Sequence, residues 1–236
     1  MTHTVHPYAH RLGIIRDWKS RWFAVGKKNY RENLATDEAV RKFLTKRLRG
    51  MYAGEVEIER SANELRVVIH TARPGLVIGR SGENAVKLRK EITAVVKKAA
   101  PGDTRTLKID IMEIRQSETN AKVLAYMIAE GLEKRLPFRR VLKQTVEKVM
   151  AVRDVKGVRI SLSGRLGGAD MSRREEIKRG RIPLQTFRAD IDFATEKAYL
   201  PYGVLGIKVW IYMGNIYPGQ ETKPASEPVQ AGASRS

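Results

Sequence analysis

The sequence predicts an α+β protein with two folded domains. Its 236 residues are enough for two domains, and a hydrophobic content of 42% is enough for ordinary cores. Segments with strand-like alternation stand between segments with helical periodicity in both halves of the chain. We therefore expect four parts: a basic, aromatic arm over residues 1–36, a first domain over 37–116, a second domain over 117–213 and a disordered tail over 214–236.

The first domain is predicted to contain six elements in the order helix, strand, strand, helix, helix, strand. Alternation in Val56-Glu57-Ile58-Glu59 and in Leu107-Lys108-Ile109-Asp110-Ile111 predicts strands that expose one charged face. The longest helix carries an apolar stripe with lysines and arginines outside it, which predicts a core side and a wet, basic side. The elements are expected near residues 37–49, 55–60, 64–71, 75–78, 83–98 and 106–114.

A G-x-x-G motif joins the short helix of this domain to the long one. The two glycines of Gly79-Arg80-Ser81-Gly82 permit a turn that a Cβ would strain, and they let a nucleic-acid backbone approach closely. The first N–H groups of the next helix are unpaired and attract phosphate, and Arg80 adds a mobile charge. With the order of the elements, the motif indicates a KH domain of the second type, an RNA module whose loop clamps backbone nucleotides. We expect Gly79, Arg80, Ser81 and Gly82 to bind RNA.

The composition also favours a nucleic-acid partner. The chain has 45 lysines and arginines against 26 aspartates and glutamates, a formal net charge of +19. A globular chain with this excess attracts polyanions. The excess is spread over the arm and both predicted domains, so we infer RNA contacts on several faces.

The arm has aromatic residues among cations, and two interpretations are open. Trp18, Trp22, Phe23 and Tyr30 can stack on bases or ribose. Alternatively, both tryptophans pin the arm to the first domain, and we favour this second interpretation.

The second domain begins with two predicted helices. Residues 118–136 and 138–152 have apolar side chains at helical spacing, and Pro137 separates them. Strand-like segments follow at 157–163, 182–194 and 206–212. This pattern predicts a small α+β domain with two helices on a mixed or antiparallel sheet.

A glycine-rich, basic stretch over residues 164–181 lies between the strands of this domain. Arginine suits phosphate recognition because its planar fork can bond two oxygens. A solvated hairpin loop is the alternative, but long irregular segments in compact domains are usually functional or disordered. We expect a loop that RNA orders, with six RNA-binding cations: Arg165, Arg173, Arg174, Lys178, Arg179 and Arg181.

The second helix of this domain carries a compact cationic ridge. At about 100° per residue, Arg139, Arg140 and Lys143 fall within an arc of roughly 100°. The alternative is a solvated face in which Lys143 pairs with Glu147 at i, i+4, which is a weak interaction. The opposite side of the helix is expected to be core: Phe138, Val141, Leu142, Val146 and Val149.

Enzymatic and metal sites are not expected. The chain has no cysteine and no G-x-x-x-x-G-K-[ST] motif. Asp190 and Asp192 could hold Mg²⁺, but we expect them to orient Arg181 and Arg188. We expect His70 to be a packing residue within a strand. The remaining histidines lack acidic or cysteine partners that would complete a metal site: His3, His6 and His10.

Several longer blocks resemble the bacterial family of small-subunit ribosomal protein three. They span roughly residues 5 to 213 and therefore cover both predicted domains. The blocks are His6-Pro7 with Arg11-Leu12-Gly13-Ile14, Thr71-Ala-Arg-Pro-Gly-Leu-Val-Ile-Gly-Arg80, Ser163-Gly-Arg-Leu-Gly-Gly-Ala169, Arg188-Ala-Asp-Ile-Asp192 and Tyr202-Gly-Val-Leu-Gly-Ile-Lys-Val-Trp-Ile211.

The resemblance implies a structural component of the small ribosomal subunit rather than an enzyme. It implies contacts in the head with small-subunit rRNA, in which Arg11 is expected to take part, and with neighbouring ribosomal proteins. It also implies a place on the mRNA entry channel, where Arg139, Arg140 and Lys143 match basic residues that assist translocation-driven unwinding of mRNA. A cytoplasmic, ribosome-bound protein without cofactor, membrane partner or small-molecule substrate is expected.

The sequence leaves two other classes of function open. A free KH-type regulator of mRNA would share the G-x-x-G loop and the basic charge. A metal-dependent nuclease would use Asp190 and Asp192, and nothing else in the sequence favours it.

Overall fold

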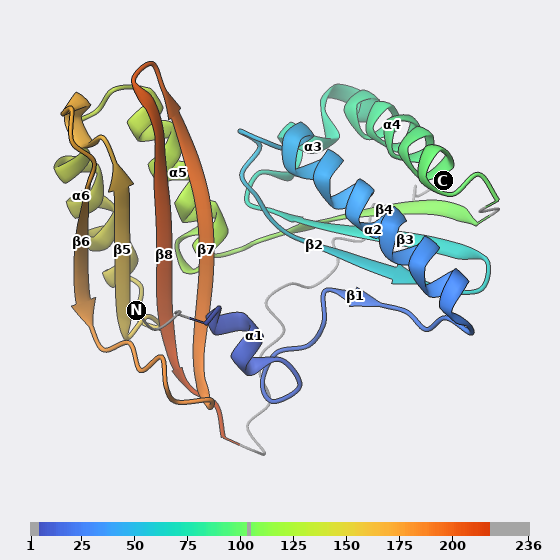
Figure 1. The fold of residues 1–236 in the computed structure, drawn as a ribbon, viewed down its shortest axis with the longest axis horizontal. Coiled ribbons are helices and arrows are strands. Elements are labelled where there is room, and N and C mark those ends of the chain that lie inside the picture. The colour runs from blue at the N-terminus through green and yellow to red at the C-terminus, as the bar shows by residue number, and fades with distance from the viewer. Residues whose placement is uncertain (1–4, 103–104, 218–236) are drawn as a thin grey trace, which may run out of the picture. The chain divides into compact units, whose positions relative to one another are not determined.

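The computed structural model describes residues 5–102 and 105–217, which form two compact units. One unit comprises residues 18–115, and the other combines residues 5–17 with 116–217. The second unit is therefore discontinuous in sequence (Figure 1). The expected disordered tail lies mostly outside the described residues, and its first residues, Gly214 and Asn215, belong to a strand.

The first unit is a four-stranded sheet with helices on one face. The sheet order is β1-β2-β3-β4, in which β2 and β3 are antiparallel while β1 pairs with β2 and β3 pairs with β4 in parallel. Helices α2 and α4 lie over the same face (Figure 1). The elements are β1 (Ser20–Arg21), α2 (Lys27–Arg47), β2 (Ala53–Arg60), β3 (Glu64–Thr71), α3 (Pro74–Ile78), α4 (Glu83–Ala99) and β4 (Thr106–Glu113).

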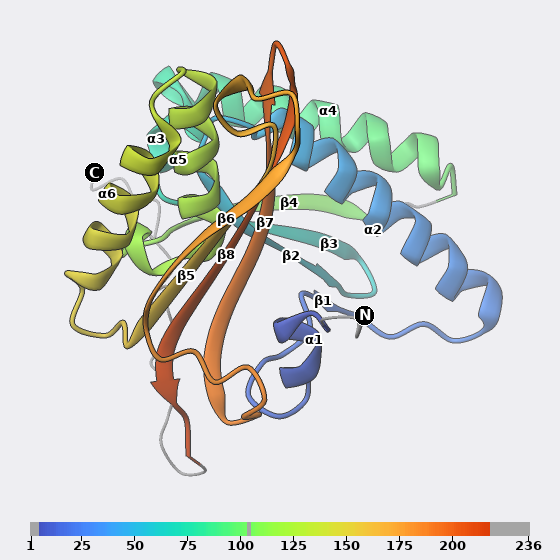
Figure 2. The same cartoon turned by 60° about the vertical axis from the view of Figure 1, so that its left-hand side comes forward.

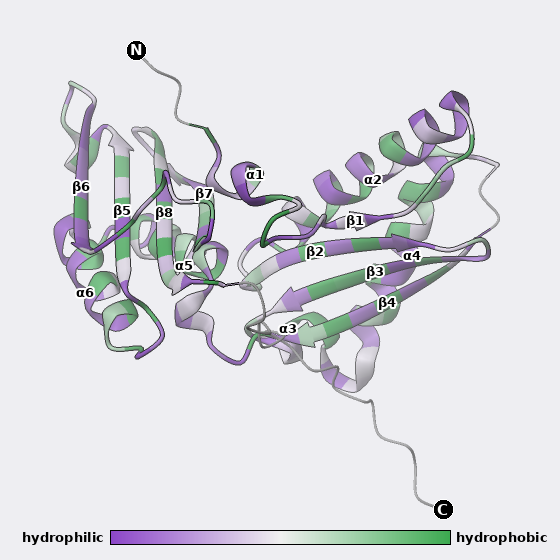
Figure 3. Ribbon diagram, turned by 90° about the horizontal axis from the view of Figure 1, so that it is seen from below, coloured by the Kyte–Doolittle hydropathy of each residue, from purple (hydrophilic) through white to green (hydrophobic). Residues whose placement is uncertain are grey.

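Alternation along the strands divides this sheet into an apolar and a charged face. Ile58, Val67 and Ile92 are at most 1% exposed and belong to one core beneath α2 and α4. The intervening residues on β2, β3 and β4 are largely charged, and hydropathy colours alternate along these strands (Figure 3). The predicted strands and the core side of the long helix are thus confirmed.

A buried ion pair links α2 to β2 within this unit. Arg60 donates to Asp37 Oδ1 at 2.5 Å from Nη2 and 3.0 Å from Nε, and the two side chains are only 2% and 4% exposed. The indole N–H of Trp22 donates to Asp37 Oδ2 at 2.7 Å. The interpretation that Trp22 pins its segment to the first domain is confirmed, whereas Trp18 is 58% exposed.

The prediction of a separate basic, aromatic arm over residues 1–36 is wrong for the described part of this segment, which belongs to the two folded units. Residues 27–36 form the first turns of α2, ten residues before the predicted start. Gly26 precedes this helix with φ +90°, and the polar first turns provide little apolar periodicity to recognise. Residues 5–17 instead belong to the second unit.

The second unit is a four-stranded antiparallel sheet in the order β6-β5-β8-β7. Helices α5 and α6 pack on one face, and α1 contacts β7 (Figures 1 and 2). The elements are α1 (Pro7–Arg11), α5 (Ala121–Glu133), α6 (Phe138–Met150), β5 (Gly157–Gly164), β6 (Arg173–Gly180), β7 (Ala189–Leu200) and β8 (Gly203–Asn215).

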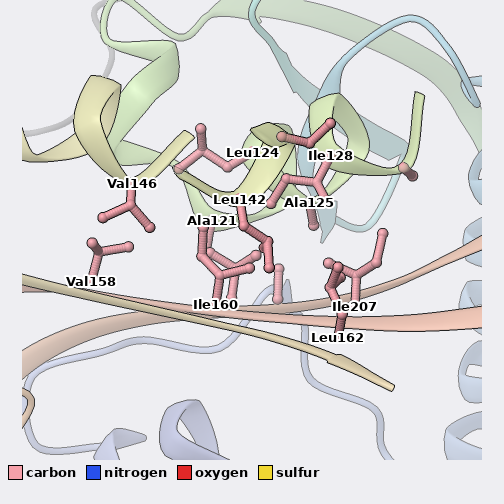
Figure 4. Packing of buried hydrophobic residues seen from close by; sticks show 14 of the residues in the cluster. Ala121, Leu124, Ala125, Ile128, Leu142, Val146, Val158, Ile160, Leu162 and Ile207 are labelled. Atoms are coloured by element: carbon pink, nitrogen blue, oxygen red, sulfur yellow. The ribbon is translucent and has the colours of Figure 1, made fainter. Parts of the chain in front are cut away.

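Its main core lies between the helices and the sheet. Leu124 and Ile128 of α5 and Leu142 of α6 face Ile160 and Ile207 of the strands, as Figure 4 shows. All five are at most 2% exposed. The predicted core side of the second helix is confirmed because Val141, Leu142, Val146 and Val149 are buried and Phe138 packs partly buried against them.

The basic stretch over residues 164–181 is not one long loop. Its second half is strand β6, paired in register with β5 from Arg173↔Gly164 to Gly180↔Gly157. Only residues 165–172 form the connecting loop, with a short 3-10 turn over Leu166–Gly168. Strand β6 could not be recognised from its sequence, Arg-Arg-Glu-Glu-Ile-Lys-Arg-Gly, because that sequence lacks apolar alternation. It is an edge strand, and its backbone pairing with β5 decides its conformation.

Candidate nucleic-acid interface

The G-x-x-G turn lies between α3 and α4 and depends on its glycines for different reasons. Gly79 has φ +76°, and a Cβ there would lie 2.6 Å from the Asn84 side-chain nitrogen. Gly82 has φ +77° with open space around it, so only its backbone conformation favours glycine. Ser81 also has a positive φ of 53°. The turn is therefore a conformation that ordinary residues strain to adopt.

This turn presents a polar loop beside apolar side chains. Arg80 and Ser81 are exposed, and α4 begins at Glu83 without a side-chain cap on its first N–H groups. Leu76, Ile78 and Val86 nearby are 47%, 39% and 55% exposed. Exposed apolar groups can pack against bases while the loop contacts the backbone. The exposure of Val86 could have been recognised from the sequence, because Val86 lies outside the apolar stripe of the long helix.

Strand alternation divides the predicted basic cluster of residues 164–181 between the two faces of the C-terminal sheet. Glu175 of β6 accepts from Arg139 of α6, so Arg173 and Glu175 face the helices. Arg174 donates from Nε to Ser161 Oγ at 2.9 Å on the opposite face. Lys178 shares that face with Arg174, and Arg179 shares the helix face with Arg173. The six cations thus form no single patch.

Arg165 and Arg181 lie at the two ends of this stretch, off the strand. Arg165 donates from Nε to Ala169 O at 2.9 Å and pairs with Asp170 at 3.3 Å, which shapes its own loop. Arg181 is exposed beyond the end of β6.

The cationic ridge on α6 is exposed on a buried support. Arg139, Arg140 and Lys143 are all exposed, whereas the opposite side of the helix is in the core. Arg139 makes two hydrogen bonds to Glu175, of 3.3 and 3.2 Å, which raise the pKa of Arg139 and lower the pKa of Glu175. The predicted alternative was a Lys143–Glu147 pair, but the carboxylate that meets the ridge comes from β6.

Arg11 does not belong to an RNA interface, which corrects the expectation from its sequence block. It is completely buried, and its guanidinium donates to backbone carbonyl oxygens. The acceptors are Ala189 O at 2.6 Å, Pro7 O at 2.8 Å, Thr186 O at 3.0 Å and Leu184 O at 3.2 Å. With these donors used inside the protein, Arg11 has the structural role of fastening α1 to the residues before β7 and to its first residue. Burial lowers the pKa of Arg11.

The carboxylates of the two aspartates of β7 are also bonded to groups within the protein. Asp190 pairs with Arg16 at 2.6 Å, and Asp192 Oδ2 accepts from the Ala121 N–H at 2.7 Å at the start of α5. The expectation that they orient Arg181 and Arg188 is therefore wrong. Among the described residues, no group of three or more histidines, cysteines or acidic residues could hold a metal ion.

His70 lies near a carboxylate rather than in apolar packing alone. Its Nε2 is 3.5 Å from Glu57 Oε1. This distance is long for a hydrogen bond, but the interaction with His70 lowers the pKa of Glu57. No arrangement of a base beside a nucleophile follows from this pair.

Comparisons with known proteins agree with the two units. The KH domain model matches residues 39–119, and the model of ribosomal protein S3, C-terminal domain, matches residues 128–211. The small ribosomal subunit protein uS3 of Lactobacillus acidophilus is 43% identical over 232 residues, which cover 98% of this chain and 99% of that protein. The chain belongs to the uS3 family. The uS3 of Lactobacillus helveticus matches with the same identity and coverage.

The uS3 family is one of structural ribosomal proteins, and this chain has its two-domain organisation. The predicted KH domain and C-terminal α+β domain are confirmed. In the described part of this uS3-family chain, no helix is long and apolar enough to cross a membrane.

Proposed function

We propose that this chain binds small-subunit rRNA in the head of the ribosome and lines the mRNA entry channel. Small-subunit rRNA, mRNA and neighbouring ribosomal proteins are its partners, and the ribosome in the cytoplasm is its site of action. The main support for the mRNA role is the exposed ridge of Arg139, Arg140 and Lys143. Among the described residues, Arg140 and Lys143 form no ion pair, so their charge is available to phosphate.

The ridge assists unwinding by holding strands rather than by supplying energy. The sequence has no nucleotide-hydrolysis motif, so translocation of the ribosome must pull the message through the entrance. Cations on a helix whose other side is buried stay in place under that force, because the helix cannot rotate without breaking its core.

The rRNA role draws on the G-x-x-G loop and on the cations of the basic stretch, which are exposed except for the half-buried Arg165. These residues are Gly79, Arg80, Ser81, Gly82, Arg165, Arg173, Arg174, Lys178, Arg179 and Arg181, without Arg11.

A sucrose gradient of native lysate tests the ribosomal role against that of a free KH regulator. We expect the chain to comigrate with the small subunit after a high-salt wash. A predominantly free pool, or one bound only to mRNA, would support the regulator instead.

A ridge variant tests the mRNA role. Replacing Arg139, Arg140 and Lys143 by Ala should leave assembly intact and slow ribosomes on messages with a stable downstream hairpin. Lys148→Ala, an exposed cation on the same helix outside the ridge, is the control. Equal rates of wild-type and ridge-variant ribosomes on both message types would leave the ridge as ordinary surface.

A further inference from the structure

The C-terminal sheet has a second face that α5 and α6 do not cover. Val158↔Ile211 and Ile160↔Val209 are core pairs against the helices. Successive side chains alternate between faces, so Arg159, Ser161, Lys208 and Trp210 point to the opposite side. We call this side the open face (Figures 1 and 2).

The N-terminal segment covers only one end of the open face. The His6 ring packs edge-on against Phe193 with centroids 4.7 Å apart, next to the small cluster that includes Trp210 and Tyr212. Further along the strands, Thr195, Lys197 and Lys208 are exposed. This part of the open face is therefore accessible to a partner.

The charge of the open face is strongly one-sided. Glu176 is the one carboxylate that the four strands place there, and it accepts from Arg159 at 2.7 Å and from Arg174 at 3.1 Å. Lys178 and Lys208 form no ion pair within the described part of the chain. The same strands place five cations on this face: Arg159, Arg174, Lys178, Lys197 and Lys208.

The open face also has an exposed aromatic ring and two buried donors that lack an acceptor in the described part of the chain. Arg159 lies over the Trp210 ring at 5.0 Å, and its Nε–H and the indole N–H are buried without a hydrogen bond in the described residues. Buried donors normally have an acceptor. At the far end, Tyr199 is 54% exposed and shares the face with Lys197. An exposed tyrosine can stack on an unpaired base.

We propose that the open face binds a single-stranded segment of RNA, on the side of the sheet opposite the α6 ridge. Lys178 pairs directly with Arg159 across β6 and β5, and neighbouring strands are about 4.8 Å apart, so phosphates of a chain that crosses the strands can meet cations from more than one strand. This inference rests on the proposed RNA-binding function and adds Arg159, Lys197, Lys208 and Tyr199 to it. An acidic protein segment is the competing occupant, but the exposed position of Tyr199 beside the cations favours a nucleic acid, whose bases can stack on a tyrosine ring.

Salt-dependent binding to a short oligouridine tests the charge contribution in the whole chain. Replacing Lys178 and Lys208 by Ala should lower the slope of log K against log salt by about 1.4, since each phosphate contact to a single strand contributes about 0.7. Lys42→Ala with Lys46→Ala, two exposed lysines on α2, should leave the slope unchanged. An unchanged slope in the Lys178 and Lys208 variant, with an unaltered thermal midpoint, overturns the proposal.

Crosslinking in assembled ribosomes identifies the occupant. A photo-crosslinking amino acid at Lys208 should attach to RNA in small subunits purified from cells. Attachment to protein alone, or to nothing, overturns the open-face proposal. Failure of the chain to enter small subunits at all, measured first with the wild-type chain, would overturn the proposed ribosomal role instead. The two failures are therefore distinguishable.

Discussion

The two sheets of this protein are layered alike but use charge differently. Each has four strands, helices on one face and charged side chains on the other. On the KH sheet, Arg66 lies between Asp110 at 2.5 Å and Glu59 at 3.4 Å, and Arg21 reaches Glu59 at 3.3 Å. On the open face of the C-terminal sheet, five cations stand beside one carboxylate, Glu176, which pairs with Arg159 and Arg174.

Exposed charge alone therefore does not identify an RNA surface. Hydrophobic alternation tells which side chains face away from the core in both sheets, but only cross-strand pairing tells which charges remain available. Exposed ion pairs stabilise a protein by about 0–1 kcal/mol, so the pairs on the KH sheet mainly cancel charge.

The buried pair of the KH unit should be its most sensitive charge interaction. Asp37→Asn removes the carboxylate charge that pairs with the buried Arg60 guanidinium, so we expect a loss of about 3–5 kcal/mol in the free energy of unfolding. Urea unfolding of the whole chain, followed by circular dichroism, measures it. Glu38→Gln removes an exposed i, i+4 pair with Lys42 and should cost at most about 0.5 kcal/mol. Similar losses in both variants would contradict the division into buried and exposed pairs.

RNA binding by the KH unit should depend on its loop and not on its sheet. Replacing Arg80 and Ser81 by Asp places like charge against phosphate, and we expect affinity for single-stranded RNA to fall about tenfold at physiological salt. The thermal midpoint should hardly change because both residues are exposed. Arg66→Ala, on the neutralised sheet face, is the matched control and should bind normally. A stronger effect of Arg66→Ala than of the loop variant would reverse the comparison.

Removing carboxylates should convert the KH sheet into a surface like the open face. Glu59→Gln with Asp110→Asn leaves Arg21 and Arg66 with fewer partners, so the salt slope of RNA binding should steepen by up to about 1.4. Stability should fall by less than about 1 kcal/mol. If RNA affinity does not rise, the shape of the sheet rather than its charge excludes RNA.

The smallest expected effect concerns acid stability. The interaction with His70 lowers the pKa of Glu57 in the folded protein. A carboxyl group with a lowered folded pKa stabilises the fold above its unfolded pKa, about 4.3, and loses this contribution as pH falls through the folded value. The wild type should therefore melt slightly above Glu57→Gln at pH 6, and the difference should shrink as the pH is lowered below about 4.3. Thermal midpoints across that range measure it, and a constant difference would assign the effect to packing.

The parts of the fold that could be predicted have strong local patterns. The strands of the KH unit alternate, and α6 separates its ridge from Val141, Leu142, Val146 and Val149 at helical spacing. The first turns of α2 and the edge strand β6 have mainly polar sequences, so their conformations depend on neighbours that no local pattern reveals.

The functional assignments divide in the same way. The family resemblance implied an RNA contact for Arg11, but three of the four carbonyl acceptors of its guanidinium lie more than 170 residues away, and the fourth lies within α1. The open face was also missed, because Arg159 and Lys208 stand far apart in sequence and meet only through the register of β5 and β8.

The fastening of α1 by Arg11 has a consequence for the order in which the chain folds during its synthesis. The KH unit is continuous, so it can form once residues 18–115 have left the ribosome that makes them. The other unit must wait, because Arg11 finds the carbonyl of Ala189 only after a stretch of 178 residues. Closing so long a loop costs entropy, but a KH unit already folded within it shortens the flexible chain that must be closed. The first helix of the sequence is thus among the last to reach its native place.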